Sequence, residues 1–174
     1  MSSKTKWLLI TIIVQFILVA LIFQDVLIHP NNYFFEAGNE AIKNYLIPAF
    51  YIRYDTGVHF SGMNYPYGEL PIFIDCQFPI AWCLQFIEHH FFPVAQYVPG
   101  IFNLMMLLSF LPCAAYIYLI LSDFQVRHWF AMISAIGITM LSPQVIRMEG
   151  HFSLSYLFYI PMILYFTTHL LQAE

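Results

Sequence analysis

The side chains best suited to acid–base chemistry and phosphate binding lie in two polar stretches, residues 29–99 and 143–153. A carboxylate can take the proton of an attacking hydroxyl group when it lies within hydrogen-bond reach. An arginine can donate two parallel hydrogen bonds to a phosphate, and on a helix Arg147 and His151 would share one face. The candidate acids of the first stretch are Glu36, Glu40 and Asp55. In a plainer interpretation these acids are solvated, and Arg147 and His151 extend to lipid headgroups.

A tight turn is predicted where two glycines and a proline interrupt an aromatic stretch, from Phe60 to Glu69. Glycine and proline favour backbone angles that turns require. Tyrosines present flat faces with polar tips, which suit a sugar ring or the membrane interface. The block is therefore either a substrate-binding turn or an interfacial anchor. Its candidate binding residues, with the neighbouring histidine, are His59, Asn64, Tyr65, Tyr67 and Glu69.

Metal-ligand patterns are weak in this sequence. His89 and His90 are adjacent, so on a helix they point in different directions, and the three cysteines have no metal-ligand spacing. We predict no metal site from spacing and free, mostly buried thiols. The sequence leaves open whether a divalent cation takes part.

The composition excludes a free soluble domain. Of 174 residues, 60% are hydrophobic and 9% are charged, and the mean hydropathy is +0.70. A small soluble domain cannot bury so much apolar side chain. The net charge is −4 with only 6 Lys and Arg residues, so we expect no nucleic-acid partner. The lipid bilayer is the expected partner.

We predict an all-α polytopic membrane bundle in a single membrane domain, residues 1–174. A spanning helix needs about 20 apolar residues. Four segments approach this length, and Pro112 should kink the second. The predicted spans are 7–28, 100–121, 129–146 and 154–171, with a long outer loop at 29–99.

The basic residues near the N-terminus suggest the orientation. Lys4 and Lys6 precede the first span, no small-residue cleavage site follows it, and the apolar run is too long for a signal peptide. We expect an uncleaved anchor with a cytoplasmic N-terminus, a cytoplasmic C-terminus, and both polar stretches outside.

Residues 71–98 are predicted to form one or two interfacial amphipathic helices, because a true span would place several ionisable groups at depth. The side expected to face water carries Gln77, Gln85, Glu88, His89 and Gln96. The side expected to face the acyl region carries Phe73, Ile80, Cys83, Leu84, Ile87 and Phe91.

Several of these motifs resemble bacterial GT-C-type glycosyltransferases. The resemblance covers most of the chain. Its most specific part is the block from Asn64 to Glu69, and it extends to the sequences at residues 38–45, Tyr54-Asp55, 141–144 and 147–151. It implies an enzyme of the bacterial inner membrane that takes a sugar from a polyprenyl-phosphate donor and passes it to an acceptor at the outer face.

The resemblance also implies roles for the polar residues. In such enzymes an acid soon after the first span serves as general base or metal ligand, so Glu40 is the first choice, then Asp55, then Glu36. The chain departs from the pattern at Asn39 and Glu40, where an Asp directly after Gly38 would be expected. Arg147 and His151 would bind the donor. GT-C enzymes have roughly double the number of spans, so we expect a longer protein, or a shortened relative that needs a partner subunit.

Two other functions stay open at this level. A small non-enzymatic subunit that scaffolds a larger complex would explain the shortage of ionisable groups within the spans. A transporter is disfavoured, because the sequence contains no inverted repeat.

Overall fold

The computed structural model describes residues 2–35, 39–73 and 77–172, with the side chains of 39–41 and 172 excepted. These residues form α-helices and short 3₁₀ helices, and the described ranges contain no β-strand. The elements are α1 (Ser3–Ile22), α2 (Gln24–Ile28), α3 (Asn39–Tyr54), η1 (Pro71–Phe73), α4 (Phe78–His90), η2 (Ala95–Tyr97), α5 (Val98–Leu108), α6 (Phe110–Asp123), α7 (His128–Met140), α8 (Gln144–Arg147), η3 (Phe152–Ser155) and α9 (Tyr159–Gln172).

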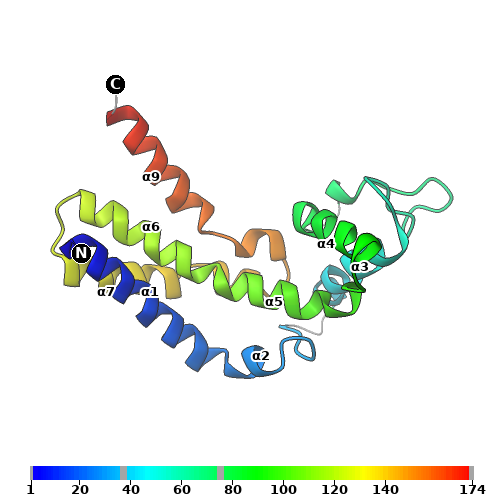
Figure 1. Ribbon diagram of the computed structural model, residues 1–174, viewed down its shortest axis with the longest axis horizontal. Helices are drawn as coiled ribbons and strands as arrows, with labels where there is room; N and C mark the ends of the chain where they lie inside the picture. Colours follow the sequence, from blue (N-terminus) through cyan, green and yellow to red (C-terminus); the bar gives the residue numbers. More distant parts are fainter. Residues whose placement is uncertain (1, 36–38, 74–76, 173–174) are drawn as a thin grey trace.

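Among the described residues, three helical segments are long and apolar enough to cross a membrane: Ser3–Ile22, Ala95–Asp123 and His128–Arg147. In the bundle that they form, α6 packs against α1, α7 and α9 (Figure 1). The all-helical class is confirmed, and these segments coincide with the first three predicted spans. They are compatible with a membrane protein.

The fourth predicted span is shorter than expected. Its apolar helix covers Tyr159–Leu171, which is about 20 Å long, whereas a bilayer core is about 30 Å thick. The five preceding residues enter η3 and a turn instead of the helix. Pro161 lies in the first turn of α9, where its missing N–H costs nothing, and so it does not kink the helix. A count of four spans is therefore not established.

The second predicted span is interrupted at Ser109, between α5 and α6. Pro112 has no N–H to donate to the carbonyl of Leu108, and its ring crowds that carbonyl. The hydroxyl of Ser109 donates to the carbonyl oxygen of Met106 at 2.5 Å. Beyond Ser109, α6 continues from α5 within the same bundle (Figure 1).

Both termini lie at the same end of the bundle (Figure 1). An ionic cluster holds this end together. Lys4 Nζ lies 2.5 Å from Asp123 Oδ1, and His169 Nε2 lies 3.4 Å from Asp123 Oδ2. One carboxylate thereby joins the start of α1 to the ends of α6 and α9.

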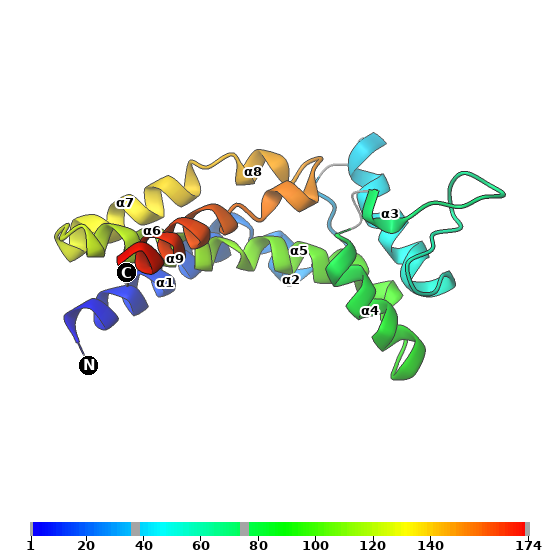
Figure 2. The ribbon, with the colours of Figure 1, turned by 90° about the horizontal axis from the view of Figure 1, so that it is seen from above.

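The opposite end carries a head module, which we define as residues 39–73 and 77–97 (Figure 2). Its main contact is between α3 and α4. The sequence analysis did not predict α3, because Pro48 and four polar residues at its start resemble loop composition. At 13 residues, α4 is too short to span a bilayer.

The prediction for the water-facing side of residues 71–98 was wrong for Gln77 and Gln85, which are buried, whereas His89 and Gln96 are exposed as expected. Trp82 and Phe86, which the prediction assigned to neither side, are more than half exposed. The amide of Gln85 donates to the carbonyl oxygens of Tyr51 (3.2 Å) and Asp55 (2.9 Å), at the end of α3. Helix ends leave carbonyls without partners, so the polar side chain faces α3 and not solvent.

A second polar residue of α4, Glu88, also hydrogen-bonds to the backbone. Glu88 Oε2 accepts hydrogen bonds from the N–H groups of Val94 and Ala95, where η2 begins. The polar face of α4 therefore joins the helix to its neighbours, and its exposed face is aromatic.

Asn103 of α5 connects the bundle to the head module. Its side chain is fully buried, and its Nδ2 donates to the carbonyl oxygens of Pro30 and Tyr33 at 2.8 Å each. Its Oδ1 accepts from the hydroxyl of Tyr45, in α3, at 2.5 Å. Burial raises the pKa of Tyr45, so this hydroxyl stays protonated and remains a donor.

We predict that Asn103→Ala lowers the free energy of unfolding by about 2–4 kcal/mol, because it leaves a buried hydroxyl and two carbonyls without partners. Denaturation of the purified protein in mixed detergent micelles measures the change. Asn32→Ala, at an exposed position of the same connection, is the control and should change it by less than about 0.5 kcal/mol. Equal losses in the two variants would show that Asn103 has no special role.

Candidate functional site

The two polar stretches contact each other, as expected from the sequence. Asn44 Nδ2, in α3, donates to the carbonyl oxygen of Gly150 at 2.6 Å. The rings of Tyr45 and Phe152 meet edge to face with centroids 4.6 Å apart. The head module therefore packs directly on the second polar loop, which we define as residues 141–158.

A further contact joins the second polar loop to the residue that precedes α4. The hydroxyl of Tyr156 donates to Gln77 Oε1 at 2.5 Å, and this hydrogen bond is buried. Buried hydrogen bonds fix the relative position of the two surfaces, because each polar group would lose its partner if the surfaces shifted. The second polar loop is thus held at two separate points of the head module.

Glu40, Arg147 and His151 lie near this interface. Glu40 precedes Asn44 by one turn of α3, which corresponds to about 6 Å along the helix surface. Arg147 ends α8, and the N–H of His151 donates to its carbonyl at 2.9 Å, so the two residues flank Gly150. Both side chains are exposed. The side chain of Glu40 and all of Glu36 lie outside the described part of the chain.

Asp55 lies away from this interface, and both of its carboxylate oxygens accept hydrogen bonds. It follows the last residue of α3, eleven residues beyond Asn44, which places it about 16 Å away along the helix. Its carboxylate is 6% exposed and accepts hydrogen bonds from the N–H and the hydroxyl of Ser61, at 3.1 and 2.6 Å. The group acts as a fixed acceptor that anchors the following turn.

The block from Phe60 to Glu69 forms the predicted tight turn. Phe60 and Glu69 exchange two backbone hydrogen bonds of 2.8 Å, and the carbonyl of Asn64 accepts from Tyr67 and Gly68. Gly68 has a positive φ of +71°, and a Cβ there would lie 2.3 Å from the His59 ring. Only glycine fits both requirements.

The turn does not join the second polar loop. It projects from the head module on the side of α3 away from α8 in both views (Figures 1 and 2). Tyr65 and Tyr67 are 93% and 87% exposed, so they face outward. The predicted binding set is therefore divided: Arg147 and His151 lie beside the start of α3, and the turn residues His59, Asn64, Tyr65, Tyr67 and Glu69 lie beyond its end.

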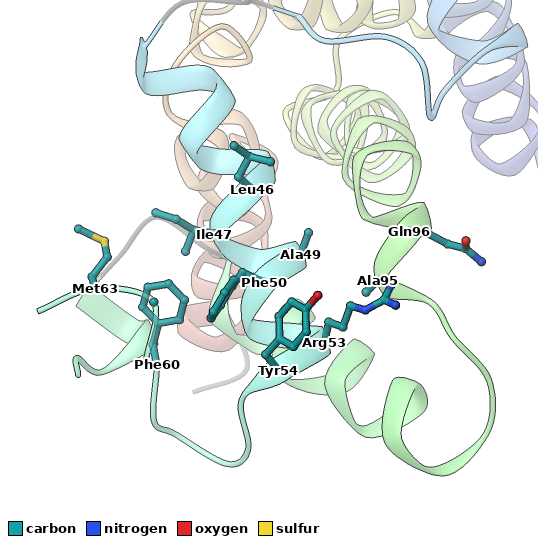
Figure 3. Close-up of a pocket in the computed structure, with 11 residues that line it drawn as sticks. Leu46, Ile47, Ala49, Phe50, Arg53, Tyr54, Phe60, Met63, Ala95 and Gln96 are labelled. Carbon is teal, nitrogen blue, oxygen red and sulfur yellow. The ribbon is translucent and has the colours of Figure 1, made fainter. Parts of the chain in front are cut away.

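The head module also contains an apolar groove that the sequence analysis did not identify (Figure 3). Its volume is about 480 Å³, within the usual range for ligand sites. Arg53 is the single charged residue among those that line it. The lining residues come from α3, the tight turn and η2: Leu46, Ile47, Ala49, Phe50, Arg53, Tyr54, Phe60, Gly62, Met63, Ala95 and Gln96. The signal in the sequence was a lone arginine within an aromatic helix.

The described part of the chain contains no cluster of side chains suited to bind a metal ion. No group of three His, Cys, Asp or Glu side chains there could hold a metal ion. His90 is used locally, since its Nδ1 lies 2.9 Å from the carbonyl oxygen of Phe86 and its ring stacks on the Phe86 ring.

Comparisons with known proteins give no match: no family model, no curated protein and no solved structure is similar to this chain.

We predict that Asp55→Ala loosens the turn, because Ser61 loses both of its acceptors. Chymotrypsin should then cleave after Tyr67 about fivefold faster, as expected for a loss of about 1 kcal/mol of local stability. Limited proteolysis with mass mapping measures the rate. Glu69→Ala, in which the backbone bridge remains, is the matched control, and equal acceleration in both variants would contradict the anchoring role of Asp55.

Proposed function

We propose that this chain is a membrane glycosyltransferase, or the N-terminal half of one, that transfers a sugar from a polyprenyl-phosphate donor to an acceptor at the outer membrane face. Glu40 is the proposed general base, and Arg147 and His151 are the proposed donor-binding residues. The resemblance to GT-C-type enzymes motivates the reaction class.

The observation that carries the proposal is the hydrogen bond from Asn44 to the carbonyl of Gly150. It brings the turn of α3 that contains Glu40 to the loop that contains Arg147 and His151. Sugar transfer from a phosphate needs a base near the acceptor hydroxyl and donors near the departing phosphate. This contact supports the proposal because it joins the backbone segments that contain the proposed acid and the proposed cations.

The proposed roles of the other acids are unequal. Asp55 is the weaker candidate, because both of its oxygens are occupied by Ser61 and its carboxylate is buried. Tyr65 and Tyr67 are proposed to stack on the acceptor or to lie at the headgroups, with Asn64, Glu69 and His59 in support. A divalent cation is left open as a cofactor.

The proposed location is the bacterial inner membrane, with the N-terminus cytoplasmic and the head module outside. Lys4 and Lys6 support this orientation, since basic residues favour the cytoplasmic side. The common position of the two termini at one end of the bundle agrees with an even number of crossings, with α9 as the proposed fourth (Figure 1).

The second candidate function is a non-enzymatic membrane subunit. The apolar side chains of α9 favour it, because Ile160, Ile163, Leu164 and Leu170 are each more than half exposed. In that function α9 packs against helices of a partner subunit instead of lipid.

We predict that Glu40→Gln lowers sugar transfer at least 100-fold, the usual contribution of a general base, with little change in donor binding. Membranes that contain the full gene product and a labelled polyprenyl-phosphate sugar provide the assay. Asp55→Asn is the matched variant and should retain most of the activity, since its role is structural.

Three outcomes of this experiment separate the hypotheses. Full activity of Glu40→Gln would contradict the assigned base. A loss confined to Asp55→Asn would move the base to that residue. No transfer by the wild type, together with a stoichiometric partner after purification in detergent, would favour the subunit function.

The proposed orientation predicts the labelling of single cysteines in a background without native cysteines. A membrane-impermeant maleimide should label Tyr65→Cys in intact cells and should label Gln125→Cys only after permeabilisation. Both positions are exposed, so accessibility differences report the membrane side. Labelling of both positions in intact cells would contradict the topology.

A further inference from the structure

The apolar groove of the head module combines hydrocarbon walls with one cation. Aliphatic and aromatic side chains of Leu46, Phe50, Phe60 and Met63 form its walls. Arg53 extends from α3 toward η2, on the opposite wall (Figure 3). A ligand that suits both features has an apolar chain and an anionic group.

The guanidinium of Arg53 has no carboxylate partner among the described residues. Its Cζ lies 5.9 Å from the centroid of the Tyr54 ring, and its side chain is exposed. None of the Asp and Glu side chains that the structure describes lines the groove. An arginine in this position offers its full set of donors to an anion such as a phosphate.

The depth of the groove matches the headgroup layer. Ala95 and Gln96, which line it, begin the longest apolar segment, Ala95–Asp123. That segment has 29 residues and is about 43 Å long if fully helical, longer than the hydrocarbon core of about 30 Å. If this segment crosses the bilayer, its ends lie among the headgroups, where lipid phosphates are found.

We propose that this groove binds an anionic phospholipid. Its phosphate receives hydrogen bonds from Arg53, and one acyl chain lies along Leu46, Phe50 and Met63. The charge complementarity and the depth select a bilayer lipid over a soluble anion, because a free phosphate would gain nothing from the apolar walls. The inference does not depend on the proposed sugar transfer.

Native mass spectrometry of the intact chain in detergent tests the proposal, with phosphatidylglycerol and phosphatidylcholine as paired probes. The wild type should prefer phosphatidylglycerol. Arg53→Gln should reduce phosphatidylglycerol binding about fivefold, the effect of roughly 1 kcal/mol per basic residue at an anionic membrane surface. It should reduce phosphatidylcholine binding less, because the choline ammonium of that lipid already offsets the charge of its phosphate. Arg53→Lys should retain most of the preference.

Arg127→Gln is the matched control, because Arg127 is exposed in the α6–α7 connection, far from the groove. It should bind both lipids as the wild type does. Equal losses in Arg53→Gln and Arg127→Gln would overturn the site. Competition by inorganic phosphate alone would show a soluble-anion site, and binding of a prenyl phosphate without phosphatidylglycerol would assign the groove to another lipid. Either result would overturn the proposal, and none of these readouts requires enzymatic activity.

Discussion

The arrangement of the two halves of the molecule depends on the buried amide of Asn103. It joins the connection after α2, the start of the second apolar segment and α3 through three hydrogen bonds. Because Asn103 is fully buried, its amide has a strong preference for these partners, so the angle between the bundle and the head module has few alternatives. The contacts between α3 and the second polar loop form on this fixed geometry.

Backbone groups at helix ends explain much of the rest of the head module. Gln85 binds the last carbonyls of α3, Glu88 binds the first N–H groups of η2, and Asp55 binds Ser61. In each case a polar side chain that resembles a surface or catalytic residue supplies a partner that a short helix or turn lacks. A module of short helices needs many such residues because it has many ends.

These hydrogen bonds between polar side chains and helix ends could not be predicted from the sequence, whereas local features could. Apolar length located three candidate spans, and Pro112 located a break, because both effects are local. The tight turn was also predicted, since Gly68 and Pro66 act on their own backbone. The burial of Gln77 and Gln85 was predicted wrongly, because hydropathy alone assigns a glutamine to water and contains no information about the groups that hydrogen-bond to it, such as the carbonyls that Gln85 binds. The groove was missed for a similar reason: α3, the tight turn and η2 meet only in three dimensions.

The two proposed sites share one rigid support. Asn44, at the interface with Gly150, and Arg53, in the groove, lie nine residues apart on α3, about 14 Å along its axis. Tyr45 and Tyr51 of the same helix are fully buried, so α3 is held along its length and cannot pivot at one end only. A lipid phosphate bound at Arg53 would therefore fix the depth of Glu40 relative to the membrane surface. If Glu40 is the proposed base, the groove has a physical reason to be on this helix, because a base that acts on a lipid-linked substrate must be held at the level of the lipid phosphates.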